Sequence, residues 1–164
     1  MKLNNRMRDI RTIKTLLTGA EAEAHQAGDS LPGAEHLLLS ALALPEGSAA
    51  RAFERVGADP RQLRAAIAAQ HADALRSIGI EPPDDAALAG GMPTATGVYR
   101  SNASARSAFQ AASKLARSDE RLVGAHVVAA VAEMEHGSAA RALAVMGIDR
   151  AALAAAAQAE ASNS

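Results

Sequence analysis

The feature that most constrains this chain is an internal repeat at a separation of 90 residues. Residues 47–59 read GSAARAFERVGAD and residues 137–149 read GSAARALAVMGID, so eight of these thirteen positions are identical. The same separation pairs His36 with His126. Repeated segments of this kind are the signature of two similar structural units that bury a shared core. We therefore expect a duplicated fold.

Both copies carry the same helix signals. Alanine, the strongest helix former, makes up about a quarter of the 164 residues. In the first copy we expect helices from Asn4 or Asn5 to Gly28, from Ala34 to Leu44, from Ser48 as N-cap to Gly57, and from Asp59-Pro60 onward. In the second we expect Ser101 or Ser104 to Arg117, Val123 to His136, Ser138 to Met146, and a last helix capped by Asp149. The sequence predicts an all-α, eight-helix bundle of two pseudo-symmetric four-helix repeats.

The repeats suggest a division of the chain. We place a first repeat at residues 1–75, a Pro- and Gly-rich linker at 76–100 and a second repeat at 101–161, with both repeats packed as one domain. The leucine-rich segment at 37–44 is apolar nearly all round, which predicts the buried centre of the first copy. In the first helix, apolar residues at spacings of three and four are expected to face the core: Leu3, Met7, Ile10, Ile13 and Leu17.

Composition excludes several classes of function. The net charge of −1 and the three aromatic residues argue against a nucleic-acid binder, and the absence of cysteine excludes thiolate sites. The apolar stretch near 37–44 is far too short to span a bilayer, and the N-terminus has no signal-peptide core. No P-loop, nucleophile or metal constellation is evident. We expect a cytoplasmic protein that is no enzyme and uses neither a cofactor nor a membrane.

The repeat resembles the duplicated N-terminal domain of the Clp/Hsp100 unfoldases, particularly the ClpC branch. The motif residues are Gly33-Ala34-Glu35-His36 followed by leucines, then Gly47-Ser48-Ala49-Ala50, with Gly124-Ala125-His126 and Gly137-Ser138-Ala139-Ala140 in the second copy. The resemblance implies a non-catalytic module, here without an ATPase, that binds proteins or peptides. It further implies partners among Clp ATPase or protease components, adaptors and arginine-phosphorylated substrates, which the chain would deliver or sequester.

The resemblance directs attention to Gly33, Ala34 and Glu35 as ligand-binding residues. In some ClpC proteins the matching glutamate helps to bind phosphoarginine, and a carboxylate can pair with a guanidinium while first-turn N–H groups receive a phosphate. Alternatively, Glu35 only complements the helix dipole. Since Ala125 replaces the acid in the second copy, we expect at most one such site. We interpret His36 and His126 as buried histidines bonded to nearby backbone, because no further metal ligands are evident near them.

Two further features leave alternatives open. Tyr99, together with Met7 or Leu3, is a candidate to line a peptide-binding groove between the repeats, or it anchors the linker. The basic run of Lys2, Arg6, Arg8, Arg11 and Lys14 is either a solvated helix face or a contact for nucleic acid or an acidic partner. The alternative function is therefore a small helical DNA-binding regulator that uses this basic N-terminal helix.

Overall fold

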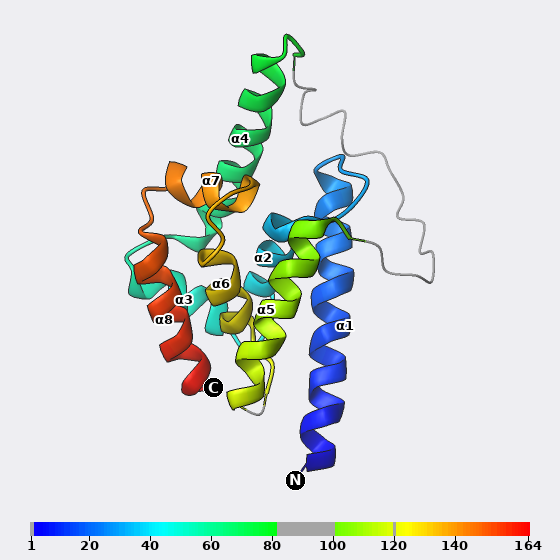
Figure 1. Cartoon of the computed structure of the whole chain (residues 1–164), viewed down its shortest axis with the longest axis vertical. Helices are drawn as coiled ribbons and strands as arrows, with labels where there is room; N and C mark the ends of the chain where they lie inside the picture. The colour runs from blue at the N-terminus through cyan, green and yellow to red at the C-terminus, as the bar shows by residue number, and fades with distance from the viewer. Residues whose placement is uncertain (1, 82–100, 120) are drawn as a thin grey trace.

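The structure, a computed structural model, describes residues 2–81, 101–119 and 121–164, and side chains from residue 6 onward except at 118–119. These residues form eight α-helices and no strand (Figure 1). The first repeat contains α1 (Lys2–Gln26), α2 (Ala34–Leu42), α3 (Ser48–Arg55), a 3-10 turn (Pro60–Gln62) and α4 (Leu63–Ser77). The second contains α5 (Ala103–Asp119), α6 (Gly124–Ala132), α7 (Ser138–Val145) and α8 (Arg150–Ser162).

The 90-residue separation of the sequence repeat is reproduced in the fold. Helices α2 and α6 begin and end at positions that differ by 90, and so do α3 and α7. The two aspartates predicted as caps also act alike: Asp59 accepts the N–H of Arg61, and Asp149 accepts the N–H of Ala151. The predicted all-α bundle of two four-helix repeats is confirmed.

The repeats interlock rather than sit side by side. Helices α2 and α6 pack against each other at the centre, α3 lies on α8 of the other repeat, and α4 correspondingly lies on α7 (Figure 1). These cross-repeat pairs are equivalent under the repeat symmetry. Each copy therefore completes its packing with helices of the other, as the shared core of a duplicated fold requires.

The central helices are mostly apolar and buried because they are surrounded by other helices. All nine residues of α6 are buried, as are Leu37 and Leu38 of α2. Gly124 allows α6 to approach the first repeat closely: a methyl group there would lie 2.9 Å from the carbonyl oxygen of Ala41 and 3.0 Å from the β-carbon of Ala49. The prediction that the leucine-rich segment is a buried centre is confirmed.

The apolar face predicted for α1 is only partly buried, because Ile13 packs against the core but Met7 and Ile10 do not. Met7 is 71% exposed and Ile10 is 66% exposed, whereas the buried positions are Leu16, Ala20 and Ala24. The helix turns another stripe toward the body, and at its N-terminal end Asp9 of that stripe accepts the N–H of Leu122 at 3.0 Å. The apolar residues of α1 form two overlapping stripes, and only one of them packs.

Several helix boundaries differ from expectation. Helix α2 stops at Leu42, because Pro45 disfavours helical geometry just before it. Helix α6 stops at Ala132 and not at His136 as expected. At this end of the helix, the Arg150 guanidinium donates to the carbonyl oxygens of Ala132 and Met134. Helix α4 runs to Ser77 and so enters the predicted linker by two residues.

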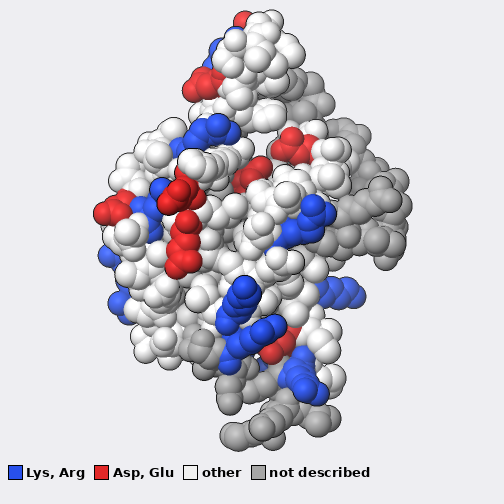
Figure 2. All heavy atoms as spheres, in the orientation of Figure 1, with Lys and Arg blue, Asp and Glu red and all other residues white. Residues whose placement is uncertain are grey.

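No described helix is by itself long and apolar enough to cross a membrane. Taken together, α7 and α8 pass that test on length and composition, but they are bent by 102° relative to each other. Lysine and arginine side chains gather over the lower part of the viewed face, along α1 and α5, while acidic side chains lie mostly higher (Figure 2).

Candidate functional site

Glu35 occupies the first turn of α2 and folds back over the residue that precedes the helix. Gly33 is the N-cap, with φ −103° and ψ −179°. A methyl group on Gly33 would lie 2.6 Å from Glu35 Oε2, so the glycine makes room for the carboxylate. The Glu35 side chain is only 13% exposed. Among the described residues, no hydrogen-bond donor is paired with this carboxylate.

Both motif histidines cap their own helices. The N–H of Gly33 donates to His36 Nδ1 at 2.9 Å, and the N–H of Val123 donates to His126 Nδ1 at 3.1 Å. Each imidazole is almost fully buried. The interpretation of these histidines as buried groups bonded to nearby backbone is confirmed.

The first-turn N–H groups of α2 are less available than the sequence suggested. The N–H of Gly33 is held by His36, and the N–H of Ala34 donates to Ser104 Oγ of the second repeat at 3.0 Å. Ser104 Oγ donates in turn to Asn102 Oδ1 at 2.7 Å. These two backbone donors already have acceptors, so a phosphate group would have to find other partners.

The fold brings together a cluster that sequence reasoning missed. Asp29 Oδ2 lies 3.3 Å from His36 Nε2, and Glu35 Oε1 lies 3.7 Å from His36 Nδ1. One ligand atom from each of the three residues lies within 4.8 Å of the others, which is a spacing that could hold a metal ion. The sequence feature that could have predicted this cluster is the spacing of seven positions between Asp29 and His36. Asp119 and His126 have the same spacing in the second repeat.

Hydrogen bonding argues against zinc at this cluster. Because His36 Nδ1 accepts the N–H of Gly33, the neutral imidazole carries its proton on Nε2. A protonated nitrogen has no lone pair for a metal, whereas metal-bound histidines usually donate from their second nitrogen. The buried Nε2 has no hydrogen-bond acceptor in good geometry and faces Asp29 as a donor. The cluster is therefore suited to hydrogen-bonding and cationic groups.

A cavity of about 540 Å³ opens beside Glu35, between the end of α1, the start of α2 and α4. Glu35 and Asp29 form an acidic wall, and Ile67 contributes an apolar one. Arg64 lines the cavity from α4 and binds Glu23 of α1, with Nη2 2.8 Å from Oε1. This cavity combines two carboxylates that lie beside His36 with a guanidinium that is held by Glu23.

At the position equivalent to Glu35, the second repeat has no acidic group. Ala125, which replaces Glu35, is fully buried, and its N–H donates to Ser48 Oγ at 2.9 Å. The preceding N–H, from Gly124, donates to Glu46 Oε1 at 2.6 Å. The start of α6 is thus closed by side chains from the first repeat.

The other candidate residues are placed differently. Tyr99 lies outside the described residues, as does the side chain of Leu3. A second cavity of about 540 Å³ lies between α1 and α5, lined by Leu17, Leu31 and Phe109, among others. This cavity lies between helices of the two repeats, but Met7 does not line it and instead lies exposed on α1. The groove predicted at Tyr99 therefore stays a prediction.

Comparisons with known proteins agree with this architecture. Residues 11–88 match the family model of the Clp repeat (R) N-terminal domain. Chaperone protein ClpC from the chloroplast of Pisum sativum is 44% identical over 54 residues, which is 33% of this chain and 6% of that protein. Chloroplastic ClpC2 of Arabidopsis thaliana is 37% identical over 87 residues, covering 49% of this chain and 8% of that protein. The chain thus spans less than a tenth of the length of these relatives.

A solved structure shares the fold over almost the whole chain. The N-terminal domain of the caseinolytic protease associated chaperone ClpD from Arabidopsis thaliana superposes with a TM-score of 0.54 and 24% identity, covering 92% of this chain and 89% of that one. The structural likeness extends through the second repeat. The comparisons give no support to the DNA-binding alternative.

Proposed function

Because residues 11–88 match the family model of the Clp repeat N-terminal domain, we propose that this chain is a non-catalytic protein-binding module that acts with Clp components. The observation that carries the proposal is this family match together with a cavity at the motif glutamate. The ligands are protein or peptide segments, and the partners are a Clp ATPase–protease or its adaptors. The module delivers such ligands or sequesters them, and our prediction for its location remains the cytoplasm.

The finer proposal is a single phosphoarginine-type site at Glu35. Glu35 and Asp29 supply two carboxylates for the guanidinium side of the ligand, and Ile67 offers an apolar surface for its methylene groups. Because Ala125 is buried and uncharged in the second repeat, the expected stoichiometry is one.

The phosphate partner differs from the one suggested by sequence. Gly33 and Ala34 already donate their N–H groups internally, so they act by shaping the site rather than by binding the phosphate. Arg61 and Arg64, which also line the cavity, supply guanidinium groups for the phosphate oxygens. Both are bound to acids in the free protein, Arg61 to Asp59 and Arg64 to Glu23, so the ligand must compete with these exposed pairs.

Calorimetric titration tests the finer proposal. A peptide with one phosphoarginine should bind with a stoichiometry near one, while the same peptide with arginine or phosphoserine should bind far more weakly. Glu35→Gln should abolish phosphoarginine binding, because it removes a carboxylate that pairs with the guanidinium. Glu54→Gln removes an exposed acid of α3 and serves as the matched control.

Two results would count against the assignment. Equal binding of the arginine peptide would show that no phosphate partner exists. A stoichiometry of two would show that the second repeat binds without an acid at Ala125. If neither the peptides nor unfolded protein substrates bound to the chain, the broader role as a protein-binding module would be overturned.

A further inference from the structure

The groove between α1 and α5 is distinct from the cavity at Glu35. Both helices pack against α2, while α1 and α5 make little direct contact (Figure 1). The space between them is the cavity lined by Leu17 of α1, Leu31 of the following loop and Phe109 of α5. We call this space, together with the exposed face of α1 below it, the α1/α5 groove.

The α1/α5 groove is continued by exposed apolar side chains of α1, Met7 and Ile10. Met7 and Ile10 lie three residues apart on α1, and Leu17 follows one heptad after Ile10. At a rise of about 1.5 Å per residue, these three positions span about 15 Å along the helix. Neither Met7 nor Ile10 joins the core, because the neighbouring stripe that contains Leu16 and Ala20 packs instead. The stripe is long enough to contact about three turns of another helix.

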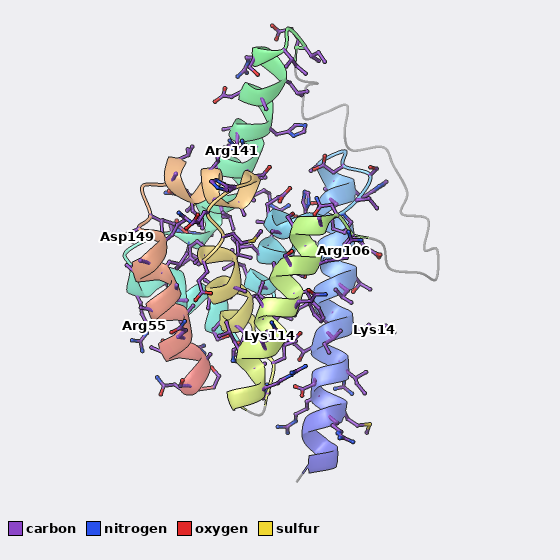
Figure 3. The ribbon with its side chains drawn as sticks, viewed as in Figure 1. Lys14, Arg55, Arg106, Lys114, Arg141 and Asp149 are labelled. Atoms are coloured by element: carbon purple, nitrogen blue, oxygen red, sulfur yellow. The ribbon has the colours of Figure 1, made fainter. Side chains whose placement is uncertain are left out.

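Cations border this apolar stripe on both helices. Lys14 of α1 and Lys114 and Arg106 of α5 are exposed, and Figure 3 shows them on the two helices that form the groove. Along 6–18 of α1 and 103–117 of α5, the exposed charges are all positive: Arg6, Arg8, Arg11, Lys14, Arg106, Lys114 and Arg117. The single acid in these segments, Asp9, is half-buried and accepts the N–H of Leu122. This basic face stands out on a chain whose net charge is −1.

We propose that the α1/α5 groove binds an acidic, amphipathic helical segment of a partner protein. Charge complementarity selects acidic flanks, and the exposed Met7–Ile10 stripe selects an apolar face at helical spacing. Nucleic acid fits less well, because it has no aliphatic ridge to cover this stripe. Phe109, the described aromatic of the groove, is half-buried and packs against the core rather than presenting a ring for base stacking. This inference rests on the proposed protein-binding role but not on Glu35.

The test uses fluorescence anisotropy with the intact chain. The probe is a labelled peptide of about 18 residues, with leucine every three or four positions and glutamate on both flanks, so that it can form a helix. It should bind saturably, and binding should weaken as NaCl rises from about 50 to about 500 mM. A peptide with lysine in place of glutamate, and an acidic peptide without leucine, should not bind.

Matched variants assign the surface. Ile10→Gln should weaken binding, whereas Val145→Gln, at a similarly exposed apolar residue of α7, should not. Lys14→Glu combined with Lys114→Glu should weaken binding about tenfold or more. Arg141→Glu, at an exposed arginine of α7, should leave binding unchanged (Figure 3).

The outcomes separate this inference from the Glu35 proposal. Retained binding of the acidic peptide to the Glu35→Gln variant supports two independent surfaces. No binding of the acidic peptide, equal binding of the lysine peptide, or equal losses in the α7 controls would overturn the inference. The inference would also be overturned if a DNA duplex bound as tightly as the acidic peptide and competed with it. Phosphoarginine binding would survive any of these results, so the two failures are distinguishable.

Discussion

The hydroxyl of Ser48 accepts the backbone N–H of Ala125 at 2.9 Å, which joins the start of α3 to the start of α6 in the other repeat. The sequence suggested Ser48 as the N-cap of its own helix, but that prediction is wrong because Gly47 holds the cap position. Beside it, the Glu46 carboxylate accepts the N–H groups of both Ser48 and Gly124, each at 2.6 Å. Side chains of the first repeat thus accept the N–H groups of Gly124 and Ala125, which the side chain of the N-cap residue Val123 cannot accept.

Ser48→Ala should therefore destabilise the whole domain. Ser48 is fully buried, and its loss leaves the buried N–H of Ala125 without an acceptor. The expected cost is about 1–3 kcal/mol in the free energy of unfolding, measured by urea denaturation followed by circular dichroism. Ser138→Ala is the matched control, because this residue holds the same repeat position but is less buried. Equal losses in the two variants would mean that the cross-repeat bond contributes nothing.

A second contact between the repeats predicts a dependence on pH. Glu160 of α8 is 7% exposed and accepts from Arg51 Nε at 2.8 Å, and it also pairs with Arg55 Nε. The hydrogen bonds from Arg51 and then Arg55 lower the pKa of Glu160 below its usual value of 4.5. A lowered pKa in the folded state means that the unfolded chain takes up the proton first as the pH falls. The stability that the Glu160 ion pairs contribute is therefore complete above about pH 4.5 and is lost as the pH falls below that value.

Glu160→Gln should remove this contribution. At pH 7 the variant should unfold with about 1–3 kcal/mol less free energy, since two charge-assisted bonds are weakened. As the pH falls below about 4.5, the free energy of unfolding of the variant should decrease less steeply than that of the unmodified chain. Glu54→Gln, at an exposed acid of α3, should leave both quantities unchanged. Parallel pH curves for the Glu160 variant and the unmodified chain would contradict the assignment.

The helices and their order could be predicted from sequence because their signals are local. Asp59 and Asp149 cap the helices that follow them, and the repeat fixes the equivalence of α2 with α6. The packed face of α1 could not be predicted, since Ile10 and Leu17 on one stripe compete with Leu16 and Ala20 on another. Only the position of α2 decides between them.

The candidate site was only partly predictable for a similar reason. Glu35 follows from its place in the repeat motif, but its neighbour Asp29 reaches it through the path of the loop between α1 and α2. The acceptor for the N–H of Ala34, Ser104, lies 70 positions away in the other repeat. Such contacts depend on how the copies dock, which no local spacing specifies.

Two glycines at the starts of the central helices should respond differently to substitution by alanine. At Gly33 the nearest atoms to an added methyl group belong to the end of the flexible Glu35 side chain, which can move. At Gly124 it meets the backbone of α2 and Ala49, which cannot move without separating the repeats. Gly124→Ala should therefore cost about 1–3 kcal/mol of stability, while Gly33→Ala should cost less than about 1 kcal/mol.

Binding should show the opposite order. Gly33→Ala displaces the Glu35 carboxylate and should reduce phosphoarginine binding in the calorimetric titration, with a nearly unchanged melting temperature. At temperatures where it remains folded, Gly124→Ala should bind like the unmodified chain. If Gly33→Ala bound normally, the position of the Glu35 carboxylate over the glycine would be irrelevant to the ligand.

The last prediction concerns the cluster of Asp29, Glu35 and His36, whose spacing by itself would admit a metal ion. Because His36 Nδ1 accepts the N–H of Gly33, zinc could bind Nε2 only by displacing its proton or by breaking the helix cap. Added zinc should therefore leave the melting temperature unchanged, since a ligand stabilises a protein only by binding its folded state. Nitrogen NMR should find the proton on Nε2 of His36. A zinc-dependent rise in melting temperature that Asp29→Asn abolishes, together with a shift of that proton to Nδ1, would establish a metal site instead.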